Sequence, residues 1–207
     1  MLLFVAGHET TVNLIGNGTL ALLRHPEQLA RLRNSDDDDF AAKATDELLR
    51  YDSPVQTSGR TTTTPVDLGE VELPARTLVI TALGAANRDP SFFGDDADQL
   101  DLGRPGAGRH QSFGNGIHFC VGAALARTEG ELAITQLVKR FPNLRLTTTE
   151  PTFAPRIVLR GLTALPLRLT PRSGPRMRSW TTSPRVVAMG TTSVGRSGRQ
   201  CPKSLWS

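Results

Sequence analysis

The chain has 207 residues, of which 38% are hydrophobic and 21% charged, so it can bury the core of one sizeable domain or two small ones. Its formal net charge of +4 is unevenly distributed: residues 172–207 hold seven of the 24 basic residues and none of the 20 acidic ones. Residues 1–171 therefore carry a net charge of −3, which argues against a basic nucleic-acid-binding domain. We expect no nucleic-acid partner.

Residues 172–207 are poor in periodic apolar positions and predict a disordered basic tail. Two readings of this tail remain open, a basic interaction arm and a segment translated from a non-native reading frame. The two cysteines, Cys120 and Cys201, lie too far apart in too different surroundings for a disulfide framework, which favours a reducing, cytoplasmic location. The apolar start of the chain reaches His8 and Glu9 too soon to span a bilayer, so no membrane association is expected.

Residues 1–24 predict a helix that is apolar nearly all round and is interrupted by the sequence AGHETT. A glycine at position 7 costs a helix about 1 kcal/mol relative to alanine, so a local purpose should offset it. The Thr10 hydroxyl can bond back to a carbonyl oxygen one turn earlier and leave room for a small ligand. On the residues alone, a satisfied polar patch on a core helix is the favoured interpretation.

The following residues predict a short helix from Pro26, a solvated loop over residues 36–39 and a helix over residues 40–51. On the last of these, Glu47 and Arg50 stand three positions apart and face the same side, as in many surface ion pairs. Short strands with a turn near Gly69 follow over residues 53–81, then an irregular stretch over residues 95–110 and a terminal hairpin after Pro142.

The segment FGNGIHFCVG at residues 113–122 places Cys120 between a glycine-rich loop and a helix. The glycines allow tight turns and close approach of a bulky partner. We expect the helix to start at Cys120, where the thiolate form is favoured, and to bury one apolar stripe (Val121, Ala124, Leu125, Leu132 and Val138). A buried structural cysteine is the alternative. A zinc site lacks a second ligand pair, and the glycine spacing fits no phosphate loop.

This segment resembles the haem-binding signature of cytochromes P450. The resemblance implies haem b as cofactor, with Cys120 as the axial thiolate ligand of the iron. Phe113, Gly114 and Gly122 match the other fixed positions of the signature and count as cofactor-binding residues. His118 resembles one partner of the haem propionates, and the strand residue Arg60 resembles another.

Two further motifs resemble this family, in the family's order. The residues around Glu9 and Thr10 resemble the motif of the helix that crosses the haem, where Thr10 would steady dioxygen and Glu9 would pass protons toward it. Glu47 and Arg50 resemble the ExxR motif, with Arg104 as the third member of a buried structural network.

The fold that the resemblance implies is mainly α with small β-sheets: residues 1–171 would form the C-terminal portion of a cytochrome P450, truncated at the oxygen-binding helix. The function implied is a haem-thiolate monooxygenase that inserts one oxygen atom of O₂ into a small organic substrate. Electrons would come from a ferredoxin-type partner that docks near Arg109 and Arg127. A peroxide-using enzyme is less consistent with the Glu9–Thr10 pair.

The alternative function is an inactive truncated fragment without stable haem binding. The half of the family fold that precedes residue 1 would be absent, and a large apolar face would be exposed. We therefore expect the chain alone to hold haem poorly or to aggregate.

Overall fold

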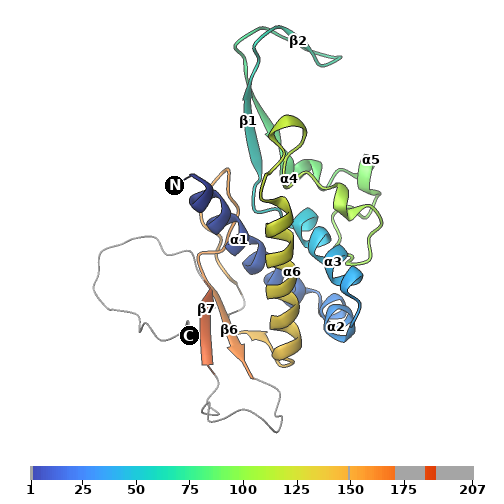
Figure 1. Ribbon diagram of the computed structural model, residues 1–207, viewed down its shortest axis with the longest axis vertical. Helices are drawn as coiled ribbons and strands as arrows, with labels where there is room; N and C mark the ends of the chain where they lie inside the picture. Colours follow the sequence, from blue (N-terminus) through green and yellow to red (C-terminus); the bar gives the residue numbers. More distant parts are fainter. Residues whose placement is uncertain (1, 149, 171–184, 190–207) are drawn as a thin grey trace, which may run out of the picture.

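The computed structural model describes residues 2–148, 150–170 and 185–189, and all structural statements below concern these residues. Four helices of at least nine residues form the body (Figure 1): α1 (Leu2–Arg24), α2 (Pro26–Asn34), α3 (Asp38–Tyr51) and α6 (Ala123–Arg140). Shorter helical turns are α4 (Leu83–Ala86), α5 (Pro90–Phe93), η1 (Ala107–Arg109) and η2 (Gly116–His118). Within the described residues no helix is long and apolar enough to cross a membrane.

The starts of α2 and α3 follow from their first residues. Pro26 stands at the first turn of α2, where its missing N–H costs no hydrogen bond. Asp37 caps α3, because its side chain accepts a hydrogen bond from the backbone N–H of Asp39 at 2.9 Å. The expected solvated loop over residues 36–39 is therefore too long by two residues. Asp38 and Asp39 belong to the first turn of α3, where their charges suit the helix dipole.

The core lies where α1, α2, α3 and α6 pack together. It is built mainly from leucines, with Leu22, Leu48, Ile134 and Val138 at 2% exposure or less. α1 and α6 approach closely at Gly130, where an added Cβ atom would lie 2.6 Å from Cδ2 of Leu14. Glycine at this position is therefore a packing requirement of the helix pair.

The apolar stripe expected on α6 is wrong at four of its five positions. Val121 is 90% exposed, Leu125 62% and Leu132 52%, and Ala124 is exposed as well; only Val138 is buried. The buried face of α6 runs instead through Ala123, Gly130, Ile134 and Val138. Half of this face consists of small residues, which carry little hydrophobic signal in the sequence although they allow the closest helix contact.

Three small antiparallel sheets flank the helices. In the first, β1 (Thr57–Thr61) pairs with β4 (Leu78–Ala82), with Arg60 opposite Val79. In the second, β2 (Val66–Asp67) pairs with β3 (Glu72–Leu73) around a turn in which Gly69 has a φ of 89°. These strands project from the helical body as one long arm (Figure 1).

The third sheet has the order β5 (Arg145–Leu146), β6 (Leu165–Leu169) and β7 (Arg185–Met189). β7 lies inside the segment that the sequence predicts to be disordered, so the prediction is wrong for these five residues. Val186 and Val187 are β-branched residue types that favour extended backbone, and the folded sheet offers this segment the free edge of β6. The remainder of residues 172–207 lies outside the described residues.

Candidate haem-thiolate site

The loop of residues 113–122 folds back on itself before α6. Gly114 and Gly116 both adopt a φ of 71°, a conformation that disfavours other residues. The backbone N–H of Cys120 donates to the carbonyl oxygen of Phe113 at 3.0 Å, which closes the loop, and the Asn115 side chain accepts from the N–H of Gly116 at 2.6 Å. The thiol of Cys120 is consequently presented on the surface as a free, exposed cysteine.

The helix after this loop starts later than expected. α6 begins at Ala123 with Gly122 at its N-cap, so Cys120 precedes the helix by three residues. The Cys120 carbonyl oxygen accepts from the N–H of Ala123 at 3.2 Å and leads the chain into the helix. A Cβ atom added at Gly122 would lie 3.9 Å from the sulfur, so the thiol stands close to the helix entrance.

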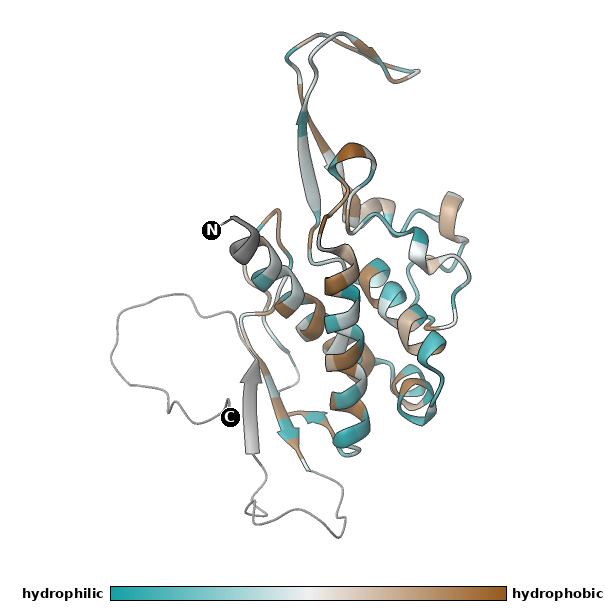
Figure 2. Ribbon diagram, viewed as in Figure 1, coloured by the Kyte–Doolittle hydropathy of each residue, from teal (hydrophilic) through white to brown (hydrophobic). Residues whose placement is uncertain are grey.

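Apolar side chains surround the exposed thiol. Ile117 is 97% exposed, Phe119 50% and Val121 90%. In the view coloured by hydropathy, the loop that leads into α6 is strongly hydrophobic (Figure 2). Apolar atoms and a sulfur atom displayed together are what a flat, apolar, metal-containing group would cover, so these residues fit a haem group.

The Glu47 carboxylate holds together three segments behind this loop. Its two oxygens accept from Nε of Arg50 at 2.7 Å and from Nη2 at 2.9 Å, and both side chains are fully buried. Nε of Arg104 donates to Oε1 of Glu47 at 3.3 Å, and the backbone N–H of Asp101 is the fourth donor, at 3.0 Å from the same oxygen. The structure thus brings Glu47, Arg50 and Arg104 together as a buried network, not as a surface pair.

Carbonyl oxygens of the irregular segment complete this network. Arg50 donates to the carbonyl oxygens of Asn87, Ala97 and Gln99 at 2.7, 2.6 and 2.9 Å. Arg104 donates through Nη1 to both the carbonyl oxygen of Phe93 and the Asp96 carboxylate. A stretch with almost no regular secondary structure is therefore fixed by two guanidinium groups, whose planar forks reach several acceptors at once.

A second polar cluster joins α3 to the start of the cysteine loop. The buried Asn87 side chain donates to Oγ of Ser112 at 2.9 Å and accepts from the N–H of Gln111 at 2.6 Å. Ser112 donates in turn to the carbonyl oxygen of Leu49 in α3 at 2.7 Å. These contacts fix the chain at the residue just before Phe113.

A third cluster is centred on Asp46, one residue before Glu47. Its Oδ1 accepts from Nε of Arg127 in α6 at 2.7 Å and lies 3.3 Å from Nε2 of His110. Since Nδ1 of His110 accepts from the N–H of Ser112, Nε2 carries the proton and donates to Asp46. Burial opposes ionisation of Asp46, but the hydrogen bonds from His110 and Arg127 outweigh it and hold its pKa below the ordinary value.

Glu9 and Thr10, for which the resemblance implies roles in proton transfer and oxygen binding, lie in α1. Thr10 donates through Oγ1 to the carbonyl oxygen of Ala6 at 2.7 Å, the back-bond to the previous turn that the sequence predicts. The Glu9 carboxylate forms an ion pair with Arg156, which lies along the chain between β5 and β6. This ion pair connects α1 to a stretch 147 residues further along the chain.

The two residues compared with propionate partners lie on the surface. The Arg60 side chain folds back on its own strand and donates to Oγ of Ser58 and to the carbonyl oxygen of Gly59, both at 2.7 Å. His118 ends the short helix η2 and is exposed. The structure shows no anionic partner for either residue among its described residues, and their expected role stays a prediction.

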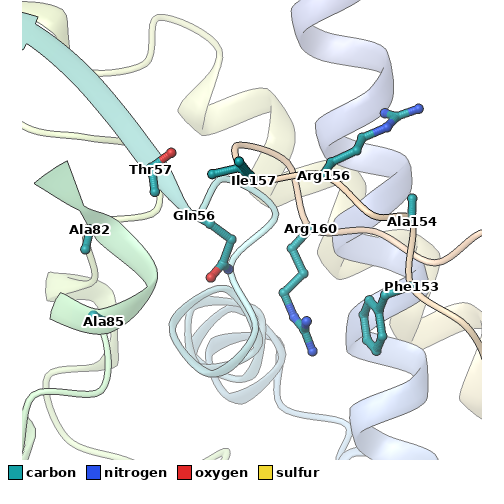
Figure 3. A pocket seen from close by; sticks show the side chains of 9 residues that line it. All are labelled: Gln56, Thr57, Ala82, Ala85, Phe153, Ala154, Arg156, Ile157 and Arg160. Carbon is teal, nitrogen blue, oxygen red and sulfur yellow. The ribbon is translucent and has the colours of Figure 1, made fainter. Parts of the chain in front are cut away.

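An open pocket of about 370 Å³ lies between the β1–β4 hairpin and residues 153–160 (Figure 3). Gln56, Thr57, Ala82 and Ala85 form one wall, and Phe153 and Ile157 belong to the other. In Figure 3 the Arg160 side chain points beside the Phe153 ring, whereas Arg156 extends toward the helix behind it. Arg160 donates through Nε to Asp52 at 2.6 Å and lies 3.8 Å over the Phe153 ring centre.

Sequence reasoning missed Asp46, Asn87, His110 and Ser112. Asn87 and His110 are fully or nearly fully buried polar residues, at 0% and 5% exposure. A motif search does not find them, because partners lie far away along the chain: Ser112 is 25 residues from Asn87, and Asp46 is 64 residues from His110 and 81 from Arg127. Among the described residues, no group of three His, Cys, Asp or Glu side chains could hold a metal ion.

Comparison with curated proteins finds close relatives in bacteria. Cytochrome P450 107B1 of Saccharopolyspora erythraea is 51% identical over 170 residues, which cover 81% of this chain and 41% of that protein. Vitamin D(3) 25-hydroxylase of Pseudonocardia autotrophica is 46% identical, with 84% of this chain and 43% of the relative covered. The chain thus spans about two fifths of the length of the relatives it matches.

Solved structures show the same partial match. The structure of P450BioI in complex with a hexadec-9Z-enoic acid ligated acyl carrier protein superposes with a TM-score of 0.76 at 44% identity, covering 81% of this chain and 43% of that one. The tirandamycin C-bound P450 monooxygenase TamI gives a TM-score of 0.75 at 43% identity, covering 81% and 42%. The mainly helical fold with small sheets is therefore part of the fold of these proteins.

The family model described as Cytochrome P450 matches residues 39–165, which include the Glu47 network, the cysteine loop and all of α6. Together with the relatives and the solved structures, this match confirms the resemblance carried by the cysteine signature. The chain belongs to the cytochrome P450 family.

Proposed function

We propose that this chain is the thiolate-bearing half of a haem monooxygenase and that Cys120 is the axial ligand of the haem iron. The observation that carries the proposal is the exposed Cys120 thiol, set among exposed apolar side chains on a loop that polar clusters anchor to α3. An accessible sulfur can bind a metal as a thiolate, and the apolar rim gains by being covered.

The haem, when bound, supplies the activation of O₂ from which one oxygen atom enters an organic substrate. Cys120 would hold it through sulfur, and the apolar side chains at 117, 119 and 121 would be covered by it. Phe113 packs at the base of the loop, with a ring centre 6.2 Å from that of Phe119. Arg60 and His118, exposed on their elements, provide the cationic and N–H groups that propionates require.

Glu9 and Thr10 are the proton-handling residues in this proposal. They are neighbours in α1, and the Thr10 hydroxyl already carries a hydrogen bond to the carbonyl oxygen of Ala6. A carboxylate and a hydroxyl in sequence can hold a proton and pass it on. The Arg156 guanidinium forms an ion pair with the Glu9 carboxylate and so fixes the position of this group.

The substrate class is a small organic molecule. The pocket of Figure 3 shares Arg156 with the Glu9 ion pair, so one side chain belongs both to the pocket wall and to the proposed proton path. The relatives are named for quite different small molecules: one is a vitamin D(3) hydroxylase, and another is called a biotin biosynthesis cytochrome P450, from Bacillus subtilis. Their variety supports the class and does not select one compound.

The electron donor in this proposal is a ferredoxin-type protein in the cytoplasm. Arg109 is exposed and stacks over the Phe92 ring at 4.3 Å, which holds its charge at the surface near the cysteine loop. Arg127 contributes less, because its Nε is engaged with Asp46. Arg109→Glu should slow electron transfer from a ferredoxin, and an unchanged rate would remove this surface from the proposal.

The decisive experiment joins this chain to the N-terminal part of cytochrome P450 107B1 that the match leaves uncovered. After haem loading, the reduced carbon-monoxide difference spectrum should show the band of a thiolate-ligated haem. Cys120→Ser should abolish this band, and Cys201→Ser is the matched control that should leave it intact. The chain by itself should take up haem in substoichiometric amounts. Absence of haem in the fusion protein would favour the alternative, an inactive fragment.

A further inference from the structure

We propose that Asp46 is a positioning residue for the cysteine loop, acting through His110 and Arg127 on Phe113. This role rests on the proposed function of Cys120 and extends it to a residue outside the family motifs described above. One carboxylate oxygen, Oδ1, receives both donors, 2.7 Å from Arg127 and 3.3 Å from His110. The three groups come from α3, α6 and the stretch after η1.

Both partners of Asp46 contact the Phe113 ring. Cζ of Arg127 lies 4.7 Å from the ring centre, and the His110 ring centre lies 5.4 Å away at an interplanar angle of 50°. The phenyl ring therefore has a guanidinium and an imidazole against it, and both are oriented by the same carboxylate. A cation against a ring is attractive, and more so when its own direction is fixed by a charged hydrogen bond.

Phe113 connects the Asp46 cluster to Cys120 through its backbone. Its carbonyl oxygen accepts the N–H of Cys120, and no other backbone hydrogen bond of the described residues joins these two ends of the loop. The other oxygen of Asp46 packs against the backbone of η1, because a Cβ atom added at Gly108 would lie 3.0 Å from Oδ2. Asp46 is thus enclosed on both sides, and a longer side chain has little room there.

The chain contains a matched control for this arrangement. Asp52, six residues further along the chain, pairs with Arg160 at 2.6 Å, and Arg160 lies 3.8 Å over the Phe153 ring. The chemistry of carboxylate, guanidinium and phenyl ring is the same, but the ring belongs to the segment of residues 153–160. Asp46→Asn and Asp52→Asn therefore remove the same charge from the same kind of stack at two different places.

The test measures amide hydrogen exchange and the rate of Cys120 alkylation in the full chain. In Asp46→Asn, the N–H of Cys120 should exchange about tenfold faster, the factor expected for loss of one charge-assisted hydrogen bond in a local opening. The thiol should be alkylated several-fold faster. In Asp52→Asn both rates should match the unmodified chain, and the amides around residues 153–160 should exchange faster instead.

Two additional measurements separate positioning from a general loss of stability. Exchange at the core residues Ile134 and Val138 should stay within twofold in both variants, since local opening does not involve them. Combining Asp46→Asn with Arg127→Gln should add little to either single change, because both remove the same link. In the haem-loaded fusion protein, Asp46→Asn should shift the reduction potential and Asp52→Asn should not.

Equal effects of the two aspartate variants on the Cys120 amide would overturn the proposal, and so would additive effects of the Asp46 and Arg127 changes. A fusion protein that takes up no haem contradicts the proposed function alone. In that event the exchange and alkylation rates, which need no cofactor, still decide the role of Asp46.

Discussion

Replacing Glu47 by glutamine removes the negative charge at the centre of the buried network while keeping the size of the side chain. Arg50 then keeps its three carbonyl acceptors but loses the charged partner of its bidentate contact, and its side chain remains fully buried. Breaking one side of a buried ion pair costs about 3–5 kcal/mol. Because the carbonyl contacts remain, we expect a loss near the lower limit, about 3 kcal/mol.

The assay is urea unfolding of the full chain at pH 7, followed by circular dichroism at a helical wavelength. Asp36→Asn is the matched control, since Asp36 pairs with Lys139 at 3.2 Å but is fully exposed, and should leave the free energy of unfolding nearly unchanged. If Glu47→Gln proves too unstable to fold, Arg104→Lys provides a milder change. It leaves three donors where the guanidinium group serves the carboxylates of Glu47 and Asp96 and three carbonyl oxygens, and should cost about 1–3 kcal/mol.

A free energy of unfolding for Glu47→Gln within 1 kcal/mol of the unmodified chain would refute this reasoning. It would mean that the network contributes no more than a surface pair does, and that carbonyl dipoles alone stabilise the buried Arg50.

Three further predictions concern packing and pH. Gly130→Ala should lower the melting temperature, because the new Cβ would lie 2.6 Å from Leu14 and overpacking costs about 1–3 kcal/mol. Gly7→Ala should raise the melting temperature, because no described atom lies within 4 Å of the new Cβ and the gain in helix propensity is about 0.5–1 kcal/mol. The pKa of Asp46 is lowered on folding, so its stabilising effect is present above about pH 4 and is lost as pH falls through the folded-state pKa; Asp46→Asn should flatten this acid limb in urea titrations between pH 2 and 7. Burial raises the pKa of Asp52 despite the ion pair with Arg160. The stabilisation that Asp52 contributes is therefore present at low pH and is lost as pH rises through the folded-state pKa, the reverse of Asp46. Asp52→Asn should steepen the rise of stability with pH above 4, and a flatter curve would contradict this assignment.

Local patterns predicted the helices of the body well. Pro26 marks the start of α2, and the apolar spacing of residues 40–51 predicts most of α3. The spacing of Glu47 and Arg50 indicates a pair on one face of a helix, but its burial is an expectation that comes from the family resemblance. Arg104 was found through the family resemblance alone, since its distance along the chain from Glu47 carries no local signal.

The errors have physical causes in tertiary packing. The buried face of α6 depends on Gly130, which looks like a weak point in a helix until Leu14 of α1 is placed against it. Asp46 looks like one of several solvent-facing acids, because the sequence gives no sign that His110 and Arg127 converge on it. The strand β7 depends on the free edge of β6, a property of the folded sheet.

The cysteine loop owes its conformation mainly to α3. Asp46 orders the Phe113 ring, Leu49 accepts from Ser112, and Glu47 with Arg50 fixes the irregular segment that leads to both. All these links join protein groups to protein groups, so the direction of the Cys120 thiol follows from the packing of one helix. A substitution on the loop-facing side of α3 should therefore change the alkylation rate of Cys120 even where the substituted residue does not contact the sulfur. The exposed side of the same helix, at Lys43 for example, offers the comparison: a change there should leave the alkylation rate of Cys120 unaltered.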